Sequence, residues 1–293
     1  MTDIGLADAL GPRARRRVAL VSVASAVVLL ALVVGALLRL SSKGQLDAER
    51  WRPFRDWRVW RFLLWTGLRH TLEAAVVGMG LAMAVGSLLA LGRLSPRRAV
   101  RWAAGAYVEF FRAVPLLLLI LFSGLALPKY GVHLSLFGYL VLALVVYNSA
   151  VFGEIFRAGI LSLDRGQSDA ALALGLRRWQ AMRLVIIPQA VRRMVPTIVS
   201  QLVTLLKDTS LGFVIAYEEL LRTANSTGEY YKNTLQTTAV VAGIYIVVNF
   251  SLSRLARWLE VRQRRRYRAG ALGVTGVEEL AVVDAAAGAR LEN

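Results

Sequence analysis

Six apolar segments, each long enough to cross a lipid bilayer, constrain the fold of this chain more than any other feature of the sequence. A helix needs about 20 residues to span the roughly 30 Å of hydrocarbon in a membrane. The segments cover about residues 18–38, 67–91, 103–127, 134–156, 195–216 and 234–254. We therefore predict an all-α integral membrane protein with about six transmembrane helices.

Arginine residues set the expected orientation of these helices. Hydrophobic residues make up 56% of the chain, yet 36 Lys and Arg outnumber 19 Asp and Glu, which gives a net charge of +17. Most of the arginines flank the apolar segments, where they can contact lipid phosphates and mark the cytoplasmic side. They form no basic helix face, so a nucleic-acid-binding function is disfavoured. We expect a multi-pass membrane protein with both termini in the cytoplasm.

The first apolar segment, 18–38, follows four arginines and invites comparison with the core of a signal peptide. It is longer than such a core, and residues 39–43 offer no small-residue cleavage site, so we expect a retained transmembrane helix. In the basic segment 50–61 that follows, aromatic residues recur at every third position, at Trp51, Phe54, Trp57 and Trp60. This spacing predicts an interfacial helix on the outer membrane surface, although so basic an outer segment runs against the positive-inside tendency.

A proline and several polar residues distinguish the third and fifth segments. Pro115 removes one backbone hydrogen bond from the third segment, and we expect it to bend that helix. A fifth helix that begins near residue 195 keeps Arg192 and Arg193 at the cytoplasmic surface. The same choice places four polar residues near the middle of the membrane, namely Lys207, Asp208, Thr209 and Ser210.

The charged stretch 161–193 cannot cross a bilayer, but it is rich in Ala and Leu and predicts a structured cytoplasmic loop. Ser168 is placed to cap a short helix, Asp169 complements the positive end of its dipole, and Gly175 allows a left-handed stop. A second helix is expected to follow and to end at Pro188. A short exposed helix with a small-residue face suits a groove on a partner protein, and an ordinary helical hairpin is the alternative.

Residues spaced along this loop resemble the EAA loop of ABC importer permeases, whose pattern is Glu-Ala-Ala, three residues, Gly, nine residues, Ile-x-Leu-Pro. Here Asp169-Ala170-Ala171, Gly175 and Val185-x-Ile187-Pro188 fall at the same spacings, with Asp for Glu, Val for Ile and Ile for Leu. The resemblance implies that the loop couples the chain to a separate ATPase, through Gln167, Asp169, Ala170, Ala171, Gly175 and Pro188.

Three further motifs resemble the branch of these permeases that takes up polar amino acids such as His, Glu, Gln and Arg. They are Phe111-Arg112-Ala113-Val114-Pro115-Leu116, Glu154-Ile155-Phe156-Arg157-Ala158-Gly159-Ile160 and Lys207-Asp208-Thr209-Ser210-Leu211. The added first helix is most similar to that of glutamate-type permeases. We expect a cytoplasmic N-terminus, an extra first helix with an outer segment, a permease core, and a basic, then poorly ordered tail, over residues 1–17, 18–61, 66–256 and 257–293.

This resemblance implies a type I ABC importer fold in a prokaryotic plasma membrane, and transport by alternating access. The implied partners are a cytoplasmic ABC ATPase dimer that holds ATP and Mg, a second permease subunit in a homo- or heterodimer, and an extracytoplasmic binding protein that delivers the amino acid. The chain has no P-loop, so we expect a transport subunit without an ATPase site or a cofactor of its own. It has no cysteine and only two histidines, which argues against a metal centre. Glutamate is the favoured substrate, while glutamine, aspartate and basic amino acids fit the same motifs.

The midplane charges Lys207 and Asp208 allow two interpretations. They can bind the carboxylate and the ammonium of an amino acid on the translocation path, or they can form a structural pair at a helix break. An ion-coupled secondary transporter or a channel could use the same charges without a separate ATPase. Such a protein would leave the loop 161–193 without a function, and it usually shows repeat-related broken helices, which the sequence does not reveal.

Arg112 and Glu154 are further candidates for the translocation path. Arg112 offers a cation to an acidic substrate, and it can instead pair with Glu109 or with Glu154. Asn148 can line the path too, with a buried hydrogen bond between helices as the favoured alternative.

Overall fold

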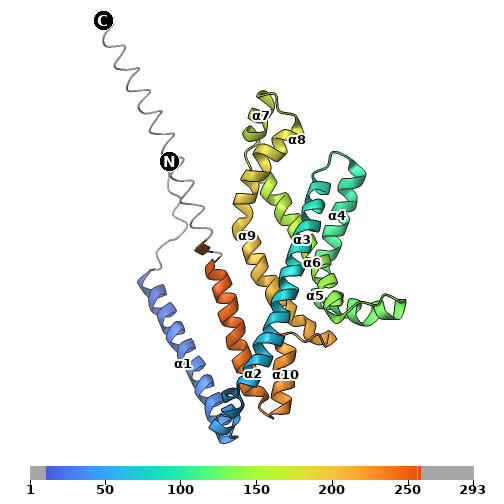
Figure 1. Cartoon of the computed structure of the whole chain (residues 1–293). Helices are drawn as coiled ribbons and strands as arrows, with labels where there is room; N and C mark the ends of the chain where they lie inside the picture. Colours follow the sequence, from blue (N-terminus) through green and yellow to red (C-terminus); the bar gives the residue numbers. More distant parts are fainter. Residues whose placement is uncertain (1–10, 256, 259–293) are drawn as a thin grey trace, which may run out of the picture.

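The structure, a computed structural model, describes residues 11–255, 257 and 258 of the 293-residue chain. Within these residues every regular element is a helix. Five helices are long and apolar enough to cross a membrane, or six if one bent pair counts as a single span (Figure 1). The predicted all-α membrane fold is therefore confirmed. The first ten residues and nearly all of the expected tail lie outside the described residues.

The elements follow one another through short connections. Their order is α1 (Pro12–Ser42), η1 (Ala48–Arg55), α2 (Trp57–Arg61), η2 (Phe62–Leu68), α3 (Arg69–Arg93), α4 (Arg98–Ala113), α5 (Leu116–Leu121), η3 (Phe122–Ala126), η4 (Leu127–Tyr130), α6 (Leu136–Leu161), α7 (Arg165–Ala173), α8 (Arg178–Ala181), η5 (Met182–Ile186), α9 (Ile187–Asp208), η6 (Thr209–Ile215), α10 (Leu220–Tyr230) and a last helix, Thr234–Leu255. Among the short elements η2, η3 and η5 are π-helical turns, and η1, η4 and η6 are 3₁₀ helices.

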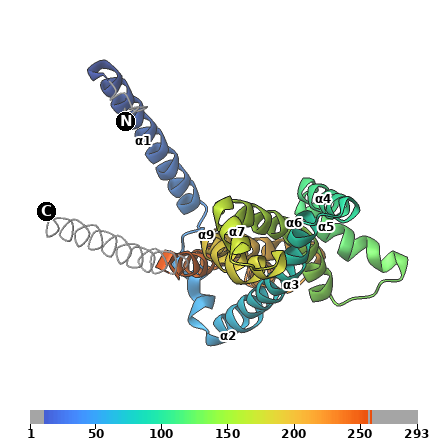
Figure 2. The ribbon, with the colours of Figure 1, turned by 90° about the horizontal axis from the view of Figure 1, so that it is seen from above.

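Helix α1 stands apart from the bundle formed by the other long helices (Figures 1 and 2). None of its most apolar window is buried inside the chain. The chain that follows α1 is nevertheless tied to the bundle, because Gln236 donates a hydrogen bond to the carbonyl of Gln45 and Arg50 donates one to the carbonyl of Lys232, at 3.1 Å. Because α1 is not buried within the chain, its apolar surface must be covered by lipid or by another subunit.

The basic aromatic segment 50–61 does not form one interfacial helix, and this prediction was wrong. Asp56 accepts a hydrogen bond from the backbone N–H of Arg58 at 2.8 Å and caps a new helix, α2. That helix continues through the π-helical turn η2 into α3, which gives one element of 37 residues. The indole N–H of Trp60 points back toward η1 and donates a hydrogen bond to the carbonyl of Phe54 at 2.8 Å. The three-residue aromatic spacing did not predict one helix, because Asp56 caps a new helix in the middle of the segment.

Pro115 breaks the third apolar segment. Val114 and Pro115 both have extended backbone conformations, since a residue before proline avoids the helical region. The helical segments Arg98–Ala113 and Leu116–Tyr130 meet at 97°. The predicted bend is confirmed, but its size makes two helices where the sequence suggested a single bent one.

The second helix of the loop does not end at Pro188, and this prediction was wrong as well. Helical structure runs without interruption over Arg178–Ile215, 38 residues, so that the helix of the fifth span begins well before residue 195. Pro188 lies in the first turn of α9, directly after the π-helical turn η5. A π-helical turn widens the helix, which leaves room for a proline ring and its missing N–H.

Helices α3 and α6 form the central pair of the bundle, with α4 and α9 packed against α6 (Figure 1). Gly86 of α3 faces α6 so closely that a Cβ atom would lie 2.6 Å from Cβ of Phe152 and 3.0 Å from the carbonyl oxygen of Ser149. Small residues let transmembrane helices approach in this way, and the contact then rests on packing rather than on hydrophobic transfer.

Replacing Gly86 by alanine is expected to destabilise the folded subunit by about 1–3 kcal/mol, because the added methyl group meets backbone as well as side chain. The midpoint of thermal unfolding of the purified complex measures this. Gly80→Ala in the same helix is the matched control, since a Cβ there meets nothing within 4 Å. Equal midpoints for the two variants would contradict the tight packing of α3 on α6.

Candidate functional site

Helix α7 has a defined beginning and a defined end. The carboxylate of Asp164 accepts from the N–H of Gly166 at 2.8 Å, so the helix begins at Arg165. The cap predicted at Ser168 was wrong, because that residue lies inside the helix. At the other end Gly175 has φ of +81°, and the N–H groups of Gly175 and Leu176 return to the carbonyls of Leu172 and Ala171 at 2.9 and 3.2 Å. The left-handed stop at Gly175 is confirmed as a Schellman motif.

Helices α7 and α8 form one tip of the molecule and present an accessible face there (Figure 1). Asp169 and Ala170 are exposed, whereas Ala171 is buried. Leu174 and Trp179 are 84% and 60% exposed. Charged, small and apolar groups thus lie together on the tip formed by α7 and α8, a surface suited to a groove on another protein.

The tip is fixed to the bundle by polar and apolar contacts. Gln189 of α9 donates to Gln167 of α7 at 3.1 Å, next to Pro188. Arg193 donates to the carbonyl of Ser162 at 2.7 Å. One hydrophobic cluster runs from the base of the tip through α6 and α9 as far as Leu205 and Leu206, and it includes Leu163, Ile186, Ala190, Met194, Phe156 and Phe152. The base of the tip and α9 therefore share one packed hydrophobic cluster.

The residues at the end of α9 point in different directions. The α-helix ends at Asp208 and a 3₁₀ helix begins at Thr209, which is fully buried and donates to the carbonyl of Leu206 at 2.7 Å. Lys207 and Ser210 line a cavity of about 610 Å³ between this break and the last helix. Asp208 is half-buried outside that lining and forms no ion pair in the described part of the chain.

Asn249 on the last helix forms part of the opposite wall of this cavity. Its side-chain nitrogen donates to the carbonyl of Tyr245 at 2.7 Å, while its oxygen is buried without a protein partner among the described residues. The cavity therefore offers the cation of Lys207 and the hydroxyl of Ser210, while the buried oxygen of Asn249 is not exposed to it. It falls in the size range of small-molecule sites, about 300–1,000 Å³. Sequence reasoning missed Asn249, whose only signal was an amide within the apolar last segment.

Glu219 ties the loop after η6 to two helices. Its buried carboxylate accepts from the N–H groups of Leu221 and Arg222 at 2.8 and 2.7 Å, and from the hydroxyl of Tyr245 at 2.9 Å. Burial raises the pKa of the Glu219 carboxyl, and these hydrogen bonds oppose that shift. The hydroxyl of Tyr245, which also lines the cavity, is thus engaged by Glu219.

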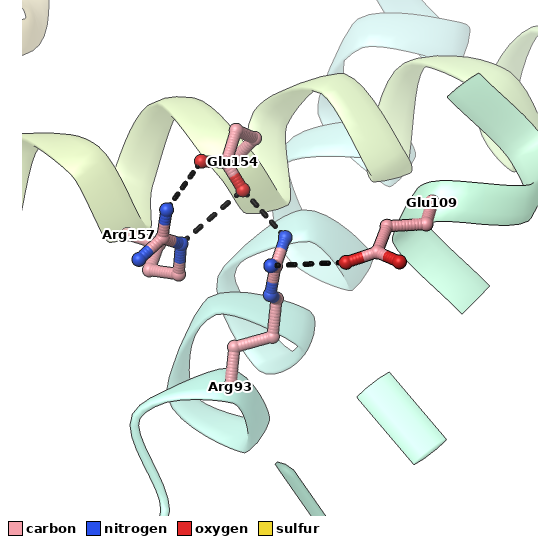
Figure 3. Close-up of polar contacts among 4 residues, drawn as sticks. All are labelled: Arg93, Glu109, Glu154 and Arg157. Carbon is pink, nitrogen blue, oxygen red and sulfur yellow. Dashed lines mark hydrogen bonds and ion pairs between the residues drawn. The ribbon is translucent and has the colours of Figure 1, made fainter. Parts of the chain in front are cut away.

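Glu154 lies in an ion-pair cluster at the end of the bundle that carries α7 (Figure 3). It accepts from Arg93 at 2.5 Å and from Arg157 at 2.6 Å, and Arg93 also lies 3.7 Å from Glu109. Arg112 forms an ion pair with neither glutamate in the described part of the chain, so the pairing offered as the alternative to a path role is not seen. Arg93, 61 residues before Glu154, takes that place.

The candidate path residues do not form one site in this structure. Asn148 of α6 accepts from Gln201 of α9 at 2.9 Å, which confirms the hydrogen bond between helices and sets the level of the two helices. From that level Glu154 lies six residues toward α7 and Lys207 six residues away from it, a separation of roughly 18 Å along the bundle. Lys207 and Ser210 thus belong to the cavity, and Glu154 does not.

No group of three or more His, Cys, Asp or Glu residues in the described part of the chain is placed to hold a metal ion.

Residues 78–265 match a family described as the binding-protein-dependent transport system inner membrane component. The chain is 42% identical to the glutamate transport system permease protein GluD of Corynebacterium glutamicum, over 78% of this chain and 85% of that protein. It is 39% identical to a probable glutamine ABC transporter permease protein of Bacillus subtilis, over 68% and 93%. It is 38% identical to the glutamate/aspartate import permease protein GltK of Escherichia coli, over 67% and 91%.

Solved structures agree with the sequence relatives. A crystal structure of an amino acid ABC transporter with histidines superposes with a TM-score of 0.65 and 30% identity, over 69% of this chain and 94% of that chain. The inward-facing MetNI methionine ABC transporter superposes with a TM-score of 0.50 and 20% identity, over 69% and 94%, which shows a shared fold alone.

Proposed function

Because the chain belongs to the family of binding-protein-dependent transport system inner membrane components, we propose that it is the permease subunit of an ABC importer that carries glutamate. The assignment of glutamate as substrate rests on the 42% identity to a glutamate permease over 85% of that protein's length. A relative named for glutamate and aspartate, at 38% identity, supports the same class of acidic amino acid. The ammonium group of Lys207, which faces the cavity, supplies a cation for a substrate carboxylate.

ATP hydrolysis takes place on a partner in this proposal. Helix α7 docks into a groove of a cytoplasmic ABC ATPase dimer, which holds ATP and Mg, and Gln167, Asp169, Ala170, Ala171, Gly175 and Pro188 form or position the docking surface. Movement of the docked helix passes through the hydrophobic cluster to Leu205 and Leu206, directly before Lys207. The cavity at the end of α9 then opens alternately to the two sides of the membrane.

The translocation path runs past the break between α9 and η6. Lys207 and Ser210 bind the substrate carboxylate there. Asp208 and Thr209 hold the break itself. Arg112 remains a prediction for the path, whereas the ion pairs of Glu154 favour a structural role for it.

Two further partners complete the transporter. An extracytoplasmic binding protein delivers the amino acid, and a second permease subunit, identical or different, supplies the other half of the path. The exposed α1 offers an apolar surface for that subunit or for lipid.

Stimulation of ATP hydrolysis tests the substrate. The complex of permease and ATPase is reconstituted with its binding protein, and hydrolysis is measured with glutamate, glutamine, aspartate or arginine. We expect glutamate to stimulate at the lowest concentration and arginine to give no stimulation. Stimulation by arginine alone would refute an acidic substrate and would leave the importer class intact.

A further inference from the structure

A second cavity, of about 710 Å³, lies beside the ion-pair cluster, at the ends of α3, α4 and α6 nearest α7. The transport cycle proposed above makes no use of it. Its charged lining consists of Arg93, Arg98, Arg101, Arg157 and Glu109, and Trp102 forms an aromatic edge. A cavity with this surplus of guanidinium groups suits an anion.

We call this cavity, lined by Arg93, Arg98, Arg101, Arg157 and Glu109, the basin. Its positive charge is only partly neutralised by acidic side chains. Glu154 compensates for Arg93 and Arg157, and Glu109 lies 3.7 Å from Arg93. Arg98 and Arg101 form no ion pair with any described residue, although Arg101 donates to the carbonyl of Ser95 at 2.9 Å. Arg98, and the guanidinium nitrogens of Arg101 that do not bind Ser95, thus remain to bind a phosphate from one turn of α4.

A separate, apolar cavity lies further along the same helix. Trp102 is 76% exposed, and Phe110, two turns further along α4, is 62% exposed. This third cavity, of about 610 Å³, is lined almost entirely by apolar side chains that include Phe110, Val114, Leu118 and Phe122. Tryptophan is enriched where lipid headgroups meet hydrocarbon. Along α4 the charged cavity comes first and the apolar cavity second, which is the order of the phosphate and the acyl chains in a phospholipid.

We infer that this surface binds an anionic phospholipid of the cytoplasmic leaflet. Its phosphate lies between Arg98 and Arg101, and its acyl chains run past Trp102 and Phe110 into the apolar cavity beside α5. A free phosphate ion would satisfy the arginines, but it would leave the aromatic edge and the apolar cavity without a role. Basic pockets between transmembrane helices at the cytoplasmic surface bind lipid headgroups of this chemistry.

Quenching of Trp102 by a brominated lipid tests the inference. The whole complex is placed in phosphatidylcholine vesicles with increasing fractions of brominated phosphatidylglycerol. The signal of Trp102 is taken as the difference between the native complex and the Trp102→Phe complex. We expect half-maximal quenching at a low fraction of phosphatidylglycerol, and a roughly tenfold to thirtyfold weaker association after Arg98→Gln with Arg101→Gln.

Matched controls decide the outcome. Arg16→Gln with Arg17→Gln removes the same charge from the exposed α1 and should leave the quenching curve unchanged. An equal shift in both double variants would overturn the inference, as would equal quenching by brominated phosphatidylcholine in the native complex, a comparison that needs no variant to fold. Release of the bound lipid by millimolar inorganic phosphate would show that the basin is a site for free phosphate, and it would overturn the inference of a phospholipid site.

Discussion

Replacing Gly175 by valine is expected to reduce substrate-stimulated ATP hydrolysis of the reconstituted complex at least about tenfold. Gly175 has φ of +81°, a conformation that costs a residue other than glycine about 1–3 kcal/mol and suits a β-branched side chain least. The strain would release the Schellman motif that ends α7, and the docking face would lose its fixed orientation. A coupled assay of phosphate release, with the binding protein and glutamate present, measures the loss.

Asparagine at the same position separates backbone strain from other effects. Asparagine adopts the left-handed conformation far more readily than valine does, so Gly175→Asn should retain most of the stimulation. A Cβ at this position meets nothing within 4 Å, so steric crowding inside the subunit does not explain a difference between the two variants. If Gly175→Val kept the native level of substrate-stimulated ATP hydrolysis, the role of α7 in coupling would be contradicted.

Replacing Lys207 by glutamine is expected to reduce the efficiency of glutamate uptake roughly thirtyfold, with the ATPase still bound. Lys207 is the cation that lines the cavity beside Ser210 and Asn249, and a hydrogen bond to a charged group contributes about 1.5–3 kcal/mol. Uptake of labelled glutamate into proteoliposomes gives the efficiency, and co-purification of the ATPase reports docking.

A variant that keeps the charge provides the control for Lys207. Lys207→Arg should retain a substantial part of the uptake, since a guanidinium group can also bind a carboxylate. Native uptake in Lys207→Gln would place the translocation path elsewhere. Loss of the ATPase in the same variant would instead assign Lys207 a structural role at the end of α9.

Local signals in the sequence predicted much of this fold. Apolar runs of bilayer length located the long helices, Gly175 marked a helix end, and Pro115 marked a break, because each of these effects depends on a few neighbouring residues. The failures have local causes that a pattern of hydrophobic residues does not carry. Asp56 restarted a helix inside the aromatic segment, and a π-helical turn before Pro188 let α9 continue where proline usually ends a helix.

The candidate site was less accessible to sequence reasoning than the fold. The tip formed by α7 and α8 is contiguous in sequence, and its motif predicted it. The cavity joins Lys207 to Asn249 on another helix, and the cluster at Glu154 recruits Arg93 from α3. Such contacts depend on how helices pack, and one sequence without relatives does not specify which polar residues of separate spans face each other.

The energy source for uptake tests the central claim most directly, because a secondary transporter would use an ion gradient and would need no ATPase. The complex is reconstituted into proteoliposomes with its binding protein, and glutamate uptake is measured with ATP but no ion gradient, then with an ion gradient but no ATP. We predict accumulation in the first condition, its loss when the binding protein or the ATPase is omitted, and none in the second. Accumulation driven by the ion gradient, in vesicles that contain only this chain, would contradict the account.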